Sequence, residues 1–149
     1  MKRLFALFYS VVIGASSLAY PSRVVNDKLL QSFKESFPNA EQVTWKELPE
    51  TYVVNFVEDG IRNSIIYEKD GTFKSSTRYY HEQNLPYYLL VNIRKRYPDK
   101  KIFGITEIST IEDIQYYIKM EDASVWTTIK MDSEGNLVLV EKLKKQSQQ

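Results

Sequence analysis

The chain has 149 residues, and its 20 lysines and arginines against 19 aspartates and glutamates leave a formal net charge of +1. It contains no cysteine, which excludes disulfides, thiol nucleophiles, thiolate metal sites and the lipid-modified cysteine of a lipoprotein. The near-neutral charge does not indicate a basic surface of the kind that binds nucleic acid, so we expect no nucleic-acid partner.

Residues 1–19 have the layout of a secretory signal peptide. Two basic residues precede an apolar run from Leu4 to Gly14, and Ser17-Leu18-Ala19 offers small residues where a signal peptidase reads them. The alternative is an uncleaved anchor, but serines interrupt the run before it reaches the about 20 apolar residues of a membrane span. We expect cleavage after Ala19 and no membrane span in the mature chain.

The remaining residues, 20–149, would carry a formal charge of −1, because cleavage removes two basic residues. A chain of this length normally forms one domain with its own core. Since no disulfide can stabilise it, burial must hold the exported domain together, as suits a bacterial periplasmic or secreted protein. The sequence therefore predicts one periplasmic or secreted domain.

Within this domain the sequence nearly repeats itself. Apolar residues at helical spacing recur 60 positions later, and apolar residues of the following segment recur 64 positions later. The first set pairs Leu29, Leu30, Phe33, Phe37 and Pro38 with Leu89, Leu90, Ile93, Tyr97 and Pro98, and the second pairs Tyr52, Phe56 and Tyr67 with Tyr116, Met120 and Met131. One unit is therefore used twice, as copy one at about 26–80 and copy two at about 84–143, with an insertion around 109–113.

Each copy is predicted to begin with a helix. In copy one, Asn26 can cap the helix, and an apolar stripe follows until Pro38 stops it. In copy two, Pro86 is a tolerated first-turn proline, and Pro98 repeats the stop.

After each helix the apolar residues alternate, which predicts strands joined by tight hairpins such as Asp59-Gly60 and Asp70-Gly71. The strands lie near 42–46, 52–57, 61–67, 73–79, 102–108, 114–120, 125–131 and 137–143. Tight hairpins pair neighbouring strands antiparallel. The predicted fold class is α+β, a tandem duplication of a helix plus four antiparallel strands, with two helices packed on one face of an antiparallel sheet.

Several short motifs carry a resemblance to a known family. They are Phe37-Pro38-Asn39-Ala40, Val43-Thr44-Trp45, Tyr52-Val53-Val54-Asn55-Phe56, Asp70-Gly71, Leu85-Pro86 and Tyr97-Pro98. From about Asn26 to Leu143, the chain resembles the PepSY-like family of exported bacterial proteins, which is also described as similar to the β-lactamase inhibitor protein fold. The resemblance implies a periplasmic or surface-exposed domain that binds or restrains other proteins, including peptidases, and it supplies no catalytic residue.

The residues themselves offer no chemical site. His81 is the one histidine, and no nucleophile elbow or orienting partner accompanies it, so we expect a linker histidine and no enzyme activity. With no cysteine and one histidine in the chain, zinc would need carboxylates at its other ligand positions. Calcium could approach Asp59, Asp70 or Asp132, but none lies in a loop with the required ligand register, so we interpret them as turn residues. We expect no metal and no cofactor.

The face of the sheet turned away from the helices, here called the open face, is the candidate binding site. If Tyr52, Val54 and Phe56 point to the helices, alternation turns a set of apolar residues the other way. That set is Val53, Val57, Ile66, Tyr117, Trp126, Val138 and Val140, flanked by Arg62, Lys119 and Lys130. Such a patch is typical of a protein-contact surface. The candidate partner-binding residues are Tyr117, Trp126, Ile66, Arg62, Val138 and Lys119.

The hypothesis is therefore an exported non-catalytic binding module, an inhibitor or regulator of a periplasmic or secreted protein such as a peptidase. The partner is expected to be another exported or envelope protein, and the alternatives are a homodimer or aromatics that merely suit strands. A glycan-binding or envelope-sensing accessory protein is a further alternative, suggested by Tyr79, Tyr80, Tyr87 and Tyr88, although these tyrosines can equally pack the two copies together. The polar tail at 144–149 is expected to be disordered.

Overall fold

Residues 25–146 are described by the computed structural model of the chain, so the expected signal peptide and the last three residues lie outside it. In this part of the chain, two α-helices, one 3-10 helix and eight strands follow one another. They are α1 (Asp27–Ser36), β1 (Glu41–Glu47), β2 (Thr51–Glu58), β3 (Ile61–Glu68), β4 (Phe73–Tyr80), η1 (Glu82–Asn84), α2 (Tyr87–Arg96), β5 (Lys101–Thr110), β6 (Ile114–Glu121), β7 (Val125–Asp132) and β8 (Leu137–Lys144). None of these helices is long and apolar enough to cross a membrane.

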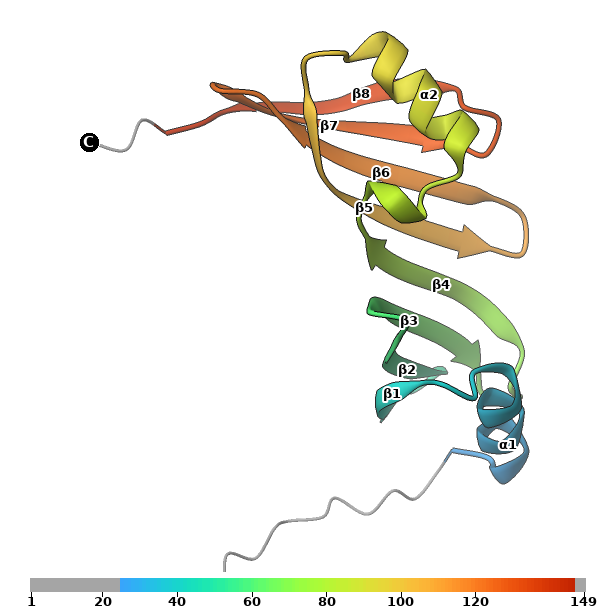
Figure 1. The fold of residues 1–149 in the computed structure, drawn as a ribbon. Coiled ribbons are helices and arrows are strands. Elements are labelled where there is room, and N and C mark those ends of the chain that lie inside the picture. Colours follow the sequence, from blue (N-terminus) through green and yellow to red (C-terminus); the bar gives the residue numbers. More distant parts are fainter. Residues whose placement is uncertain (1–24, 147–149) are drawn as a thin grey trace, which may run out of the picture.

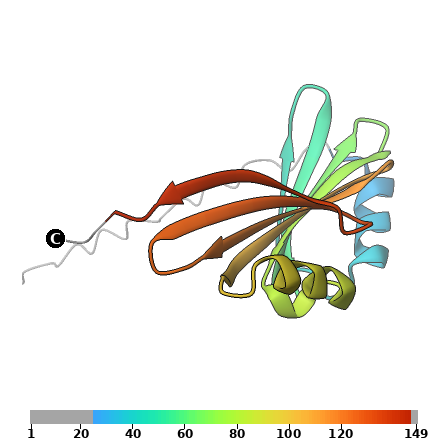
Figure 2. The same ribbon diagram turned by 90° about the horizontal axis from the view of Figure 1, so that it is seen from above.

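The strands form one antiparallel sheet in sequence order, from β1 at one edge to β8 at the other (Figure 1). This confirms the predicted α+β fold class. The sheet is strongly twisted, as Figure 2 shows from above. Each copy contributes half of the sheet, and β4 pairs directly with β5 where the copies meet.

Both helices pack on the same face of the sheet, as predicted. Directly opposite residues on neighbouring strands share a face, and one row of such residues runs from β2 to β8. The row is Phe56, Asn63, Arg78, Glu107, Tyr116, Met131 and Leu137. Phe56 packs in the cluster that contains Phe33 of α1, and Met131 packs in the cluster that contains Leu89 of α2. The row therefore places both helices on one side of the sheet.

The helix ends follow from local chemistry. The Asn26 side chain caps α1 by accepting a hydrogen bond from the Lys28 N–H at 2.9 Å. Pro86 is the N-cap residue of α2 rather than a residue of its first turn, because η1 turns the chain immediately before it. Pro86 therefore lies one position before the helix and not in its first turn, where the sequence had predicted it.

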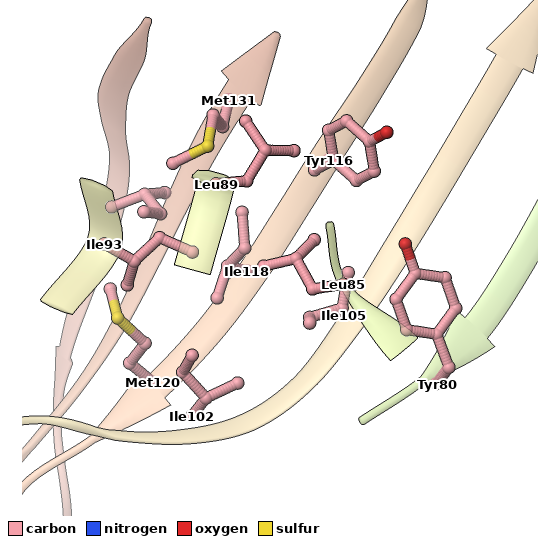
Figure 3. Packing of buried hydrophobic residues seen from close by; sticks show 11 residues of the cluster. Tyr80, Leu85, Leu89, Ile93, Ile102, Ile105, Tyr116, Ile118, Met120 and Met131 are labelled. Atoms are coloured by element: carbon pink, nitrogen blue, oxygen red, sulfur yellow. The ribbon is translucent and has the colours of Figure 1, made fainter. Parts of the chain in front are cut away.

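The core has two parts, one beneath each helix. Beneath α2, eleven buried residues from β4, the residue after η1, α2, β5, β6 and β7 pack together (Figure 3). Beneath α1, Phe33 packs edge-on against Phe56, with ring centroids 5.1 Å apart, and against Trp45 at 5.4 Å. Burial of each such side chain contributes about 1.5–3 kcal/mol, so packing and not helix propensity decides these helices.

The end of the chain differs from the sequence-based expectation. The predicted disordered tail began at residue 144, but Lys144 is the last residue of β8. The Lys145 N–H then donates to the Ser124 carbonyl at 2.8 Å, and its ammonium pairs with Glu121 at 2.7 Å. These contacts, which depend on residues about 20 positions earlier, keep the first part of the tail on the sheet.

Candidate binding surface

The open face carries a continuous row of side chains that crosses seven strands. Each member lies directly opposite the next. Along its own strand, each is next to a residue of the helix-side row that begins at Phe56, and since successive side chains point to opposite faces, it points away from the helices. The row is Val57, Arg62, Tyr79, Thr106, Tyr117, Lys130 and Val138. Copy one therefore supplies its first three residues, and copy two supplies the last four.

The middle of this row borders a groove of about 650 Å³. β4 stops at Tyr80, which pairs with Ile105, while β5 extends back to Lys101. The sheet therefore has a notch beside the first residues of β5, and the groove lies at this notch. It is lined by the β2–β3 turn, the end of β4, η1 and the facing parts of β5, β6 and β7. Its size falls within the range of ligand pockets.

The floor of the groove includes Gly104, and a Cβ atom at this position would have no heavy atom within 4 Å. At one side, His81 Nδ1 lies 3.2 Å from the carbonyl oxygen of Phe103. A carbonyl can only accept a hydrogen bond, so this contact requires the proton on Nδ1. His81 therefore ties the loop between the copies to the free edge of β5, and Nε2 is the nitrogen left for other partners.

Next to the groove, Trp126 is held between basic and aromatic side chains. The ring of Phe103 meets it edge-on, with the centroids 5.1 Å apart. The ammonium of Lys119 lies 4.9 Å from the indole centroid, and that of Lys145 lies 4.7 Å from it. Two cations on one indole are each within the range of cation–π attraction. Trp126 is half-buried by these neighbours and presents a fixed aromatic surface.

The structure places three of the six candidate residues, Arg62, Tyr117 and Lys119, in the lining of the groove, and Trp126 beside Lys119. Arg62, Tyr117 and Val138 belong to the same row, and Lys119 and Trp126 contact each other beside it. Ile66 lies on the open face opposite Val53, four residues along β3 from Arg62, which is about 13 Å at the usual rise of a strand. Ile66 and Val138 therefore lie on the open face but outside the lining of the groove.

Val140, which alternation also assigned to the open face, lies at an irregularity. The register of β7 and β8 shifts there, so that Leu139 is opposite Ile129, Glu141 is opposite Thr128, and Val140 has no opposite residue. The simple alternation used for the sequence does not extend through this bulge.

Sequence reasoning missed three residues of this surface. The position of Phe103 on this surface could not be predicted, because a shift of register between Ile102 and Gly104 interrupts the alternation along β5. Lys145 fell in the tail that was expected to be disordered. Tyr79 was considered only as a residue of the junction, yet it lies in the open-face row with the Arg62 guanidinium 6.0 Å from its ring centroid.

The four tyrosines of the junction do not form one platform. Tyr79 lies on the open face, whereas Tyr80 is buried in the core on the helix side. Tyr87 and Tyr88 begin α2 and are largely exposed, and the Tyr88 hydroxyl donates to the Ser133 carbonyl at 2.7 Å. The glycan alternative depended on a shared aromatic surface here, and the arrangement does not provide one. Only Tyr80 packs between the copies as the other interpretation required.

On the helix side, Glu107 forms a polar cluster with the end of copy one. Its carboxylate accepts the Tyr80 hydroxyl at 2.5 Å and the Arg78 guanidinium at 3.3 Å. Burial raises the pKa of Tyr80 well above its ordinary value, and the adjacent Glu107 carboxylate raises it further. The Tyr80 hydroxyl therefore stays protonated and acts as a fixed hydrogen-bond donor that joins the two copies.

The aspartates considered as calcium ligands lie in turns. Asp70 accepts the Thr72 N–H at 2.8 Å. Asp132 accepts the Asn136 side-chain amide at 2.9 Å, the Asn136 backbone N–H at 2.9 Å and the Glu134 N–H at 3.0 Å. These hydrogen bonds hold the pKa of both carboxyls below its ordinary value. Within residues 25–146, no three histidine or carboxylate side chains are grouped in a way that could hold a metal ion.

Comparison with known proteins identifies the fold. No family model matches the chain, and no curated protein matches it. Among solved structures, it is similar to a DUF2874 family protein from Bacteroides uniformis, with a TM-score of 0.59 and 12% identity over 80% of this chain and 89% of that one. A candidate periplasmic protein from Bacteroides eggerthii gives a TM-score of 0.59 and 14% identity, over 80% of this chain and 88% of that one.

A BLIP-like protein from Bacteroides fragilis is also similar, with a TM-score of 0.57 and 15% identity over 80% of this chain and 85% of that one. At such identities the likeness concerns the fold alone. It confirms the part of the sequence resemblance that concerned the β-lactamase inhibitor protein fold, and it leaves the PepSY-like family unconfirmed. The chain has a BLIP-like α+β fold, with two helices on one face of an eight-stranded antiparallel sheet.

Proposed function

We propose that this chain is an exported, non-catalytic binding protein that docks another exported or envelope protein on the open face of its sheet. The observation that carries the proposal is the cluster of Tyr117, Trp126, Phe103 and Arg62 around one groove. Aromatic residues and arginine are the side chains most enriched at the energetic centres of protein interfaces. Phe103 is 54% exposed, so a large apolar side chain of this cluster is open to water and would be buried by a bound partner.

Separate observations support the proposed export and the proposed non-catalytic binding activity. The N-terminal layout favours export, and one of the proteins with the same fold is a candidate periplasmic protein. The resemblance to the PepSY-like family favours an inhibitory or regulatory role, for example toward a peptidase. The described residues hold no constellation of nucleophile, base and orienting partner.

The experiment is capture of a partner from the periplasmic extract of the source bacterium, followed by an affinity measurement with the purified partner. Replacing Tyr117 and Trp126 together with serine should weaken binding at least about thirtyfold, because an aromatic hot spot contributes about 2 kcal/mol or more. The matched control is Tyr87→Ser, an exposed tyrosine on α2 that lies off the open face. Undiminished binding by the double variant would place the interface elsewhere and refute the proposal.

A further inference from the structure

We propose that the surface recognised by the open face is acidic: a protruding segment of the partner protein that carries at least two carboxylates and enters the groove. This inference rests on the proposed function and adds the chemistry of the partner to it. Three cations of the open face carry the argument, namely Arg62, Lys119 and Lys130.

None of these three cations forms an ion pair within residues 25–146. Each instead lies over an aromatic ring: Arg62 is 6.0 Å from the Tyr79 centroid, Lys119 is 4.9 Å from Trp126, and Lys130 is 6.0 Å from Tyr117. Lys145, the fourth cation of the surface, differs because Glu121 pairs with it at 2.7 Å. The three rings restrict their cations without neutralising them, so the charges remain available to a ligand.

The groove brings two of these three charges to one concave site. Arg62 and Lys119 both line it, and the one acidic residue in its lining is Asp59 of the β2–β3 turn. The whole chain has a formal charge of only +1, so the cluster does not reflect a generally basic protein. Two cations against one carboxylate leave the lining with an excess of positive charge, which attracts ligands of the opposite sign.

The same charges disfavour a second copy of this chain as the occupant. A two-fold dimer brings the same patch of both subunits together. The three unpaired cations of one copy would then meet those of the other, and such like-charge contacts are costly. Carboxylates of a different protein would instead form charge-assisted hydrogen bonds with the guanidinium and ammonium groups.

The test uses a displayed library of random short peptides selected on the full-length protein. We expect the selected peptides to be enriched in aspartate and glutamate. Their affinity should fall at least about tenfold in the variant Arg62→Gln/Lys119→Gln/Lys130→Gln, because the charged donors to the peptide carboxylates are removed. The matched control, Lys28→Gln/Lys34→Gln/Lys95→Gln, removes the same charge from exposed positions on the helices and should bind as the parent does. Circular dichroism verifies that both variants are folded.

Two further measurements locate the peptide. Gly104→Leu should block binding, because its side chain extends into the groove from a position where a Cβ atom meets nothing. Raising the salt from about 0.01 M to about 0.15 M should weaken binding, because the Debye length falls from about 30 to about 8 Å.

Other outcomes separate this inference from the proposed function. Selected peptides that lack acidic enrichment but are lost in the Tyr117→Ser/Trp126→Ser variant would overturn the acidic partner and leave the binding face intact. Failure to select any peptide, or peptides indifferent to that double variant, would overturn both. A concentration-dependent dimer in sedimentation equilibrium that dissociates in the Tyr117→Ser/Trp126→Ser variant would assign the face to a second copy and overturn the inference.

Discussion

The Tyr80 hydroxyl donates to Glu107 Oε2 at 2.5 Å and so joins the last residue of β4 in copy one to the middle of β5 in copy two. Glu107 is 9% exposed, so its carboxylate depends on protein donors rather than on water. The pair is therefore a specific polar link between the copies, placed on the helix side of the sheet.

Removing this donor should destabilise the protein. Tyr80→Phe leaves the buried Glu107 carboxylate with a missing hydrogen bond, and we expect a loss of about 1–3 kcal/mol in the free energy of unfolding. Urea denaturation followed by circular dichroism measures it. The control is Tyr116→Phe, which removes another tyrosine hydroxyl from the helix side of the sheet and should change stability by less than about 0.5 kcal/mol. Equal losses in both variants would show that the loss of a tyrosine hydroxyl in general, and not of the hydrogen bond to Glu107, is responsible.

The opposite effect is expected at Thr127. This residue is fully buried, and its hydroxyl oxygen has no hydrogen-bond partner within the described chain. Thr127→Val replaces the hydroxyl with a methyl group of similar size and should raise the free energy of unfolding by about 1 kcal/mol. Thr128→Val, one position along β7 on the open face, serves as the control with a smaller expected change. A loss of stability in Thr127→Val would indicate an internal partner for the hydroxyl, such as a bound water.

Two glycines provide a matched pair for backbone strain. Gly135 has φ of +91°, which disfavours any residue with a Cβ atom, and that atom would lie 2.4 Å from Asn92 Nδ2. Gly135→Ala should cost about 1–2 kcal/mol, mostly from the backbone, since the amide of Asn92 can move aside. Gly104→Ala should be neutral or slightly stabilising, because nothing lies within 4 Å of its Cβ atom. Thermal denaturation distinguishes them, and equal effects would contradict this assignment.

The stability of the protein should fall in acid partly through Asp122. The Lys100 ammonium, which donates to Asp122 Oδ2 at 2.5 Å, holds the pKa of this carboxyl well below its usual range, together with the N–H groups of Ser124 and Val125. A lowered folded-state pKa contributes stability above the unfolded pKa of about 3.9, and this stability is lost as the pH falls through the folded value.

Asp122→Asn should therefore lower the free energy of unfolding at neutral pH, and its difference from the parent should shrink below about pH 4. Denaturant titrations across this range measure the difference. Asp99→Asn is the control, because Asp99 is exposed and has no side-chain hydrogen bond within the described residues. A difference for Asp122→Asn that is the same at pH 2 and pH 7 would contradict the role of its charge.

Much of the fold could be predicted because local patterns carry it. Alternation along single strands assigned Arg62, Tyr117 and Val138 to one face, and the hairpins left little choice of neighbour. The pairing of Tyr79 with Thr106 could not be read in this way, because η1 and α2 separate the two strands. The groove depends on that pairing, so it was not visible in the sequence.

Irregularities account for the remaining differences. A bulge near Gly104 turns Phe103 toward Trp126, and a period-2 pattern cannot register an inserted residue. The position of Lys145 depends on contacts with Glu121 and the Ser124 carbonyl rather than on its own neighbours in sequence. Both features belong to the tertiary structure alone.

The row on the open face has an evolutionary consequence. Each of its seven residues comes from a different strand, and its neighbours along that strand belong to the helix-facing side. A single codon change in the row therefore alters one position of the open face and leaves the buried core untouched. The open face can therefore diversify residue by residue under selection while the scaffold persists.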